Sequence, residues 1–120
     1  MEPRKPALMI VDDDAQLRRA YVRMLGQTYE ITEANGVQDA LRQIHTLDPD
    51  VVLCDILMGD GTGVDLHRLL VETPWARRFV FTTGGCSKEH EVYVRVCGLP
   101  LLEKPADLNK LFETLAAVAT

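Results

Sequence analysis

The segment ALMIVDD, residues 7–13, decides how the rest of the chain is interpreted. Five apolar residues are followed directly by Asp12 and Asp13, and a second apolar run, VVLCD at 51–55, ends in the same way at Asp55. A short continuous apolar run is typical of a strand that is covered on both faces, as strands of parallel sheets are. The two segments therefore predict two interior strands with carboxylates at their carboxyl ends.

The remaining apolar segments alternate between strand and helix patterns. Further strands are expected at 29–34, 79–83 and 99–103. Five helices are expected, over 17–25, from Gly36 to Leu47, from near Val64 to Thr73, and over 88–96 and 108–118. In the third helix four residues are expected to pack inward: Leu66, Leu69, Leu70 and Val71. Because strands that alternate with helices pair in parallel through right-handed crossovers, we predict an α/β, doubly wound, five-stranded parallel sheet.

Composition limits the classes of function. The chain has 120 residues, of which 47% are hydrophobic and 26% charged, so we expect one domain over residues 1–120. A formal net charge of -5 offers no basic surface for phosphate backbones, and we expect no direct nucleic-acid binding. The apolar run near the N-terminus is too short for a signal peptide or a membrane span, which favours a cytoplasmic protein without membrane association.

The carboxyl ends of the predicted strands carry every candidate for chemistry. Ligands of doubly wound sheets bind at that edge. The candidates are Asp12, Asp13, Asp55, Thr83 and Lys104. Two carboxylates about 4 Å apart repel by roughly 4 kcal/mol at an effective dielectric constant of about 20, so a clustered set needs a cation. Hard oxygen ligands with room for water favour Mg²⁺, with Mn²⁺ as the alternative.

This ordered set resembles the receiver domain of two-component response regulators. The resemblance lies in IVDDD, DILMGDGTGVDL, FTTGG and EKP, which together span nearly the whole chain. It implies a flavodoxin-like fold with strand order 2-1-3-4-5. It also implies a self-phosphorylating phosphoacceptor domain rather than an enzyme, which takes a phosphoryl group on Asp55 from a histidine kinase or a histidine phosphotransfer domain and then changes its partner binding. A homodimer is compatible with the resemblance.

The resemblance also implies a role for each candidate. Asp13 would bind Mg²⁺ directly and Asp12 largely through water, while Asp55 and the backbone carbonyl of Leu57 would complete the protein ligands. Thr83 would contact the phosphoryl group and shift on activation. Lys104 would pair with that group, and the Lys104-Pro105 bond is expected to be cis.

Several residues depart from the family pattern or receive no role. Gly59 stands where the family usually has proline, which predicts a more mobile loop, and Leu101 stands where an aromatic ring commonly rotates inward. Asp14 is assigned to the start of the first helix and not to the metal site. No role is assigned to the histidines or the cysteines: His45, His67 and His90, expected at the surface or on a helix face, and Cys54, Cys86 and Cys97.

Two other functions stay open from the residues alone. One is a receiver-like interaction module that works without phosphorylation, against which the complete acidic, threonine and lysine set argues. The other is a haloacid-dehalogenase-like phosphatase, because Asp12-x-Asp14 matches the start of its motif, although Gln16 occupies the position of Thr or Val. A stand-alone regulator, an N-terminal receiver and the receiver of a hybrid sensor kinase also remain open.

Overall fold

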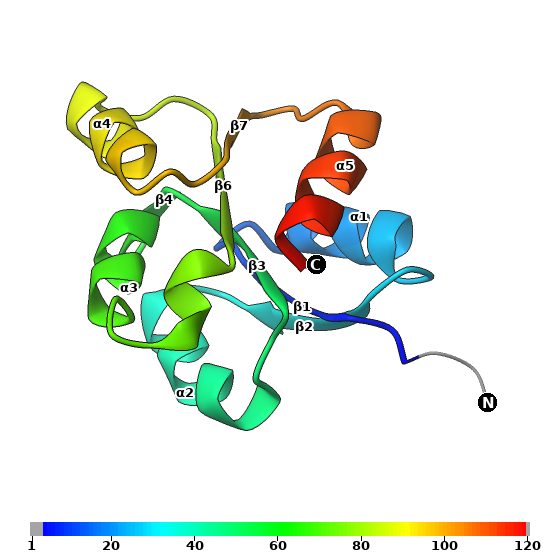
Figure 1. Ribbon diagram of the computed structural model, residues 1–120. Coiled ribbons are helices and arrows are strands. Elements are labelled where there is room, and N and C mark those ends of the chain that lie inside the picture. The colour runs from blue at the N-terminus through cyan, green and yellow to red at the C-terminus, as the bar shows by residue number, and fades with distance from the viewer. Residues whose placement is uncertain (1–3, 120) are drawn as a thin grey trace.

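The computed structural model describes residues 4–119, and its central element is a five-stranded parallel sheet (Figure 1). The sheet consists of β1 (Ala7–Val11), β2 (Glu30–Ala34), β3 (Val51–Asp55), β6 (Phe79–Thr83) and β7 (Leu101–Glu103). Their order is β2-β1-β3-β6-β7, with every neighbouring pair parallel. Counted along the sheet strands alone, this is the predicted order 2-1-3-4-5, so the doubly wound α/β prediction is confirmed.

Within residues 4–119, five helices cover the two faces of the sheet. They are α1 (Ala15–Leu25), α2 (Val37–Leu47), α3 (Gly63–Leu69), α4 (Lys88–Val96) and α5 (Leu108–Ala119). Helices α1 and α5 lie on one face, and α2, α3 and α4 lie on the other (Figure 1). Two short elements were not expected: a 3-10 turn, Pro74–Arg77, and an antiparallel hairpin of β4 (Leu57–Met58) and β5 (Gly61–Thr62).

The strand residues alternate between two cores, one on each face. In β1, Met9 packs with the α2, α3 and α4 side, whereas Leu8 and Ile10 pack with α1 and α5. All five residues of β3 are buried. Burial on both faces explains why β1 and β3 are continuous apolar runs rather than alternating ones.

Two strands begin later than predicted. Tyr29 was expected in the second strand, but its backbone N–H donates to the Leu25 carbonyl, 3.0 Å away, so this residue still belongs to the turn after α1. Leu99 was expected in the fifth strand, but its N–H donates to the Val94 carbonyl of α4, 3.2 Å away. In both cases an apolar side chain packs inward before the backbone joins the sheet.

The predicted inner face of α3 is half wrong. Leu66 and Leu70 are buried as expected, but Leu69 is 63% exposed and Val71 is 58% exposed. The helix ends at Leu69, and the N–H of Leu70 donates to the His67 carbonyl, three residues back, in a tighter turn. This early end breaks the helical spacing that would have turned Val71 inward.

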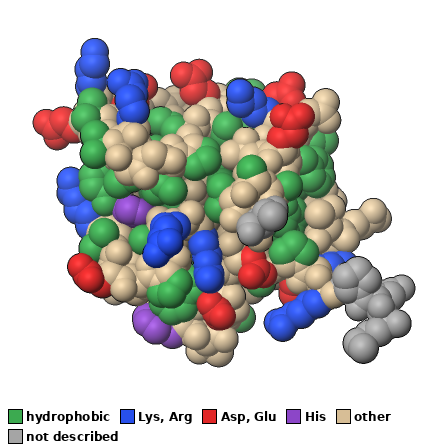
Figure 2. Space-filling model, viewed as in Figure 1, with side chains coloured by type: hydrophobic (Ala, Val, Ile, Leu, Met, Phe, Trp, Pro, Cys, Tyr) green, Lys and Arg blue, Asp and Glu red, His purple; other side chains and the backbone are tan. Residues whose placement is uncertain are grey.

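The surface carries charges of both signs. Figure 2 shows Lys, Arg, Asp and Glu side chains interspersed with hydrophobic ones on the face that it displays. Among the residues described, no helix is long and apolar enough to cross a membrane.

Candidate functional site

The structure brings three predicted carboxylates together at the carboxyl edge of the sheet. Asp12 and Asp13 follow β1, and Asp55 ends β3, which pairs directly with β1. Oxygen atoms from the three side chains lie within 4.8 Å of one another. Asp12 is 1% exposed and Asp55 is 7% exposed, whereas Asp13 faces solvent. Adjacent parallel strands that end in the same type of residue therefore form one compact acidic cluster.

Lys104 reaches this cluster from beyond β7. Its Nζ lies 3.0 Å from Asp12 Oδ2 and 3.1 Å from Asp55 Oδ2. Partial burial by itself lowers the pKa of Lys104, but the hydrogen bonds and charges of Asp12 and Asp55 outweigh it and leave that pKa raised. One ammonium group thus serves two buried carboxylates and stays charged.

The electrostatic balance of the cluster remains negative. Burial raises the pKa of Asp55, the Lys104 hydrogen bond opposes that shift, and the Asp12 carboxylate adds to it. The Arg18 guanidinium lies nearby, but its Nη1 donates to the Asp12 backbone carbonyl at 2.6 Å and its Nε pairs with Glu33. With Asp13 included, the three carboxylates exceed the charge of Lys104 by two, which suits a divalent cation with oxygen ligands.

Thr83 ends β6, next to the cluster. It is buried and lies one residue beyond Thr82, the partner of Asp55 in the strand register. Its Oγ1 accepts a hydrogen bond from the Gly85 N–H at 3.0 Å, and its carbonyl accepts one from the Lys104 N–H at 2.8 Å. Because Oγ1 is the acceptor in this bond, the hydroxyl hydrogen can be donated to another oxygen.

The β4–β5 hairpin runs along the exposed side of the cluster. The Leu57 N–H hydrogen-bonds to the Asp55 carboxylate and acts to lower its pKa. At Gly59, an added Cβ would lie 3.6 Å from Asp13 Oδ2. The hairpin that contains Leu57 therefore borders two of the three carboxylates.

Asp14 lies outside the cluster, as expected. Its Oδ1 accepts hydrogen bonds from the N–H groups of Gln16 at 3.0 Å and Leu17 at 3.2 Å, so it caps α1. Its own N–H donates to Asp12 Oδ1 at 2.9 Å. The Lys104-Pro105 bond is cis, as expected.

The sequence did not reveal the place of His67. It is a core residue, 3% exposed, and its Nδ1 lies 2.7 Å from the Tyr93 hydroxyl while its Nε2 lies 2.9 Å from the Ala76 carbonyl. Its ring also meets the rings of Phe79 and Phe81 edge-on. The position of His67 on α3 carries no local signal of this burial, which arises from α4 and the 3-10 turn.

An apolar groove adjoins the site and was also missed. It lies between α1 and the start of α5 and is lined by Leu17, Tyr21, Met24, Lys104, Pro105, Ala106, Leu108 and Leu111. Met24 and Leu108 are exposed large apolar residues of this groove, and Lys104 belongs to both the groove and the acidic cluster. The signal that could have found it is the pair of apolar residues at the outer edges of two predicted helices.

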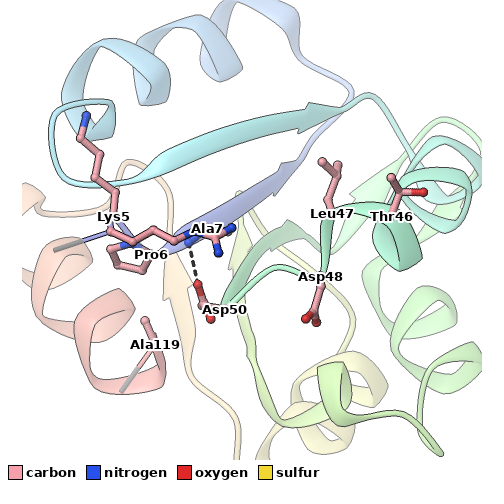
Figure 3. A pocket seen from close by; sticks show the side chains of 9 residues that line it. Lys5, Pro6, Ala7, Thr46, Leu47, Asp48, Asp50 and Ala119 are labelled. Atoms are coloured by element: carbon pink, nitrogen blue, oxygen red, sulfur yellow. Dashed lines mark hydrogen bonds between the residues drawn. The ribbon is translucent and has the colours of Figure 1, made fainter. Parts of the chain in front are cut away.

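A polar hollow lies at the amino ends of β1 and β3, on the side of the sheet opposite the acidic cluster (Figure 3). Asp50, just before β3, accepts a hydrogen bond there from the N–H of Ala7, the first residue of β1, at 2.7 Å. None of the predicted site residues lines this hollow.

The family model of the response regulator receiver domain matches residues 8–116 of the chain. Among curated proteins, the chain is 30% identical over 112 residues to the transcriptional regulatory protein DpiA of Escherichia coli K12, covering 90% of this chain and 50% of that protein. It is 28% identical over 111 residues to the sensory transduction protein LytT of Bacillus cereus, covering 90% of this chain and 45% of that protein. The chain thus spans about half the length of these relatives.

Solved structures show the same likeness. A response regulator receiver protein from Pseudomonas putida has a TM-score of 0.85 at 26% identity, covering 97% of this chain and 99% of that one. A CheY-like receiver domain protein from Methanospirillum hungatei has a TM-score of 0.86 at 24% identity, covering 97% and 94%. The second likeness concerns the fold alone.

Proposed function

This chain belongs to the response regulator receiver domain family, and on that premise we propose that it accepts a phosphoryl group on Asp55 in a Mg²⁺-dependent reaction. The observation that supports this most directly is the buried Asp12 and Asp55 pair with Lys104 within 3.1 Å of both. We assign the donor to a histidine kinase or a histidine phosphotransfer domain in the cytoplasm. The modified domain would then change its partner binding.

The residues present fit a magnesium site. Both Asp12 oxygens already have partners, since Oδ1 accepts from the Asp14 N–H and Oδ2 pairs with Lys104, so Asp12 would act largely through water. Asp13 is exposed and free to bind directly, with Asp55 and the Leu57 carbonyl as the further protein ligands. When bound, Mg²⁺, or Mn²⁺ in its place, supplies neutralisation of negative charge on the phosphoryl oxygens.

The protein groups carry out the transfer itself. An Asp55 carboxylate oxygen attacks phosphorus, an O–P bond forms as the N–P bond to the donor imidazole breaks, and the imidazole nitrogen keeps the electron pair. Lys104, already charged beside Asp55, pairs with a phosphoryl oxygen. Thr83 donates its hydroxyl hydrogen, which its bond from the Gly85 N–H leaves available, to another of these oxygens.

The experiment is phosphorylation by a small donor. Incubation with acetyl phosphate and Mg²⁺ should add one phosphoryl mass to the wild-type protein and none to Asp55→Asn, as read by intact mass spectrometry. Asp14→Asn is the matched control, because it changes a neighbouring aspartate that caps α1 and should keep the adduct. An unmodified wild-type protein, or an adduct that persists in Asp55→Asn, would contradict the proposal.

The apolar groove supports the assignment of the donor. It extends from Lys104 along α1 and α5, and its exposed members Met24 and Leu108 offer a surface for another protein. A phosphohistidine must come within bonding distance of Asp55, which lies 3.1 Å from Lys104. We therefore place the donor domain on this groove.

A further inference from the structure

The side chain of Asp60 fastens the β4–β5 hairpin to the N-terminus of α2. Its Oδ1 accepts a hydrogen bond from the Val37 N–H at 2.9 Å, and its Oδ2 accepts one from the Gln38 N–H at 3.1 Å. The residue that precedes α2, Gly36, supplies no side-chain cap. Two of the free N–H groups at the start of this helix are thus satisfied by a residue of the hairpin that follows β3.

The backbone around this contact leaves room for it. A Cβ added at Gly36 would lie only 2.5 Å from Asp60 Oδ1, so a larger residue there would push the carboxylate away. At Gly61, φ is +150°, and an added Cβ would lie 3.2 Å from the Val37 side chain. Glycine at both positions allows the hairpin and the helix to approach this closely.

The same hairpin borders the acidic cluster on its other side. Leu57 hydrogen-bonds to the Asp55 carboxylate through its N–H, and Gly59 passes close to Asp13 Oδ2. The end of the hairpin is held separately, because Thr62 and Asp65 form a reciprocal capping box at the start of α3 with both hydrogen bonds at 3.0 Å. Asp60 therefore makes the contact that holds the turn of the hairpin, residues 59–60, between the acidic cluster and α2.

We propose that Asp60 is a positioning residue for the metal site: its carboxylate holds Leu57 and Gly59 beside Asp55 and Asp13 before any cation binds. This inference rests on the proposed function, because it concerns the same site. Glycine at position 59 allows the backbone of residues 59–60, which join β4 to β5, many conformations. Without the Asp60 hydrogen bonds, this segment would lose conformational entropy when the Leu57 carbonyl is fixed as a ligand. The Asp60 hydrogen bonds remove that cost in advance.

The first test uses the metal-free protein. In ¹⁵N relaxation measurements without Mg²⁺, the amides of Leu57, Gly59 and Gly61 should be ordered in the wild type and mobile in Asp60→Ala. Asp60→Asn keeps one acceptor oxygen and should give an intermediate order. Asp39→Ala is the matched control: the Asp39 hydrogen bonds go to Asn35, Arg42 and Gln43 at the same end of α2 and not to the hairpin, so the hairpin should stay ordered.

The second test is Mg²⁺ affinity, followed by amide shifts in a titration. Asp60→Ala should bind Mg²⁺ about five-fold more weakly, because the hairpin would then lose its conformational entropy when the cation binds and not when the protein folds. At saturating Mg²⁺ its rate of phosphorylation by acetyl phosphate should be within about two-fold of wild type, because the reacting groups are unchanged. A merely structural role for Asp60 would lower the melting temperature and leave the affinity unchanged.

The outcomes separate this inference from the proposed function. Equal hairpin order and equal Mg²⁺ affinity in wild type and Asp60→Ala would overturn the role of Asp60. A loss of hairpin order and of Mg²⁺ affinity in Asp39→Ala as large as that in Asp60→Ala would overturn it too. A wild-type protein that binds no Mg²⁺ at millimolar concentration would overturn the proposed function. In that case a rigid hairpin in metal-free Asp60→Ala would overturn the role of Asp60 as well. A mobile hairpin in that variant would still support the inference that Asp60 holds the hairpin in place.

Discussion

At the scale of single residues, the site is a balance between two buried carboxylates and one ammonium group. Asp12 and Asp55 share Lys104, so one buried negative charge has no full partner in the metal-free protein. Burial raises the pKa of Asp55, which reports that its ionised form is disfavoured there. The folded, metal-free protein is therefore destabilised by this buried charge, and its free energy of unfolding should rise when the charge is removed or Mg²⁺ binds.

Asp55→Asn should stabilise the metal-free protein. The amide keeps the size of the side chain and removes one of the two buried charges, so the free energy of unfolding in EDTA should rise by about 1 kcal/mol. Millimolar Mg²⁺ should stabilise the wild type by about 1 kcal/mol and the variant by less. Urea unfolding in both buffers measures these differences, and a variant that is less stable than wild type in EDTA would be evidence against a strained charge cluster.

Sequence reasoning identified the members of this cluster because each follows an apolar strand. Asp12, Asp55 and Lys104 could be placed at one edge once the sheet was predicted to be parallel, since parallel strands end on the same side. The partners could not be predicted in the same way. Both Asp12 oxygens accept hydrogen bonds, one from the Asp14 N–H and one from Lys104 Nζ. These bonds depend on the path of the backbone at Asp14 and on the length of the Lys104 side chain, which extends across β6.

At the scale of elements, the N-terminus of α2 is held by two aspartates. Asp60 acts from the hairpin, and Asp39 acts from within the helix, where its Oδ2 accepts from the Asn35 N–H at 2.9 Å. Burial by itself raises the pKa of Asp39, but the hydrogen bonds from Asn35, Arg42 and Gln43 outweigh it and leave that pKa lowered. An aspartate with a lowered pKa stabilises the fold above its unfolded pKa and loses this effect as pH falls through the folded pKa.

Asp39→Asn should therefore show a stability loss that depends on pH. At pH 7 the variant should be less stable by about 0.5 kcal/mol, a small value because the carboxylate is close to solvent. The difference should shrink as pH falls below about 4 and vanish once both proteins carry an uncharged side chain at this position. Thermal unfolding from pH 7 to pH 2.5 measures it, and a difference that is constant with pH would show that charge plays no part.

His67 links α3, α4 and the 3-10 turn through two hydrogen bonds. Because Nε2 faces the Ala76 carbonyl, it must carry a hydrogen, and in the neutral ring Nδ1 then accepts from the Tyr93 hydroxyl. His67→Leu should lower the free energy of unfolding by about 2 kcal/mol, because the Ala76 carbonyl is left buried without its donor. Tyr93→Phe, which removes only the half-buried hydroxyl, should cost about 0.5 kcal/mol. Equal losses in urea unfolding would contradict this ranking.

These elements show where sequence patterns stop being informative. The apolar runs of β1 and β3 predict their bounds, because burial on both faces leaves a continuous signal. The strands of the β4–β5 hairpin are too short to show a period, so the sequence predicts only a loop around Gly59. His67 looked like a residue of a surface or a helix face because its burial depends on Tyr93, which is distant in the sequence.

At the scale of the whole molecule, the two faces of the sheet offer different surfaces. The groove between α1 and α5 is continuous with the site through Lys104, and Met24 and Leu108 are exposed large apolar residues in it. On the other face, α4 exposes Val96, which is 80% accessible and belongs to no part of that groove. A donor protein must reach Asp55, whereas a small phosphodonor needs no docking surface.

Charged substitutions in the groove should therefore separate the two kinds of donor. Met24→Glu and Leu108→Glu should each slow phosphoryl transfer from a phosphorylated histidine phosphotransfer domain at least about ten-fold, because a desolvated carboxylate opposes docking. Uptake from acetyl phosphate should stay within about two-fold of wild type, because neither residue touches Asp55. Val96→Glu adds the same charge on the opposite face and should leave both rates unchanged. The comparison uses a donor that transfers to the wild type, with the rates read from phosphoprotein gels. Slower transfer in Val96→Glu but not in the groove variants would move the docking surface to α4, and equal slowing from both donors would mean that the groove residues act on the site itself.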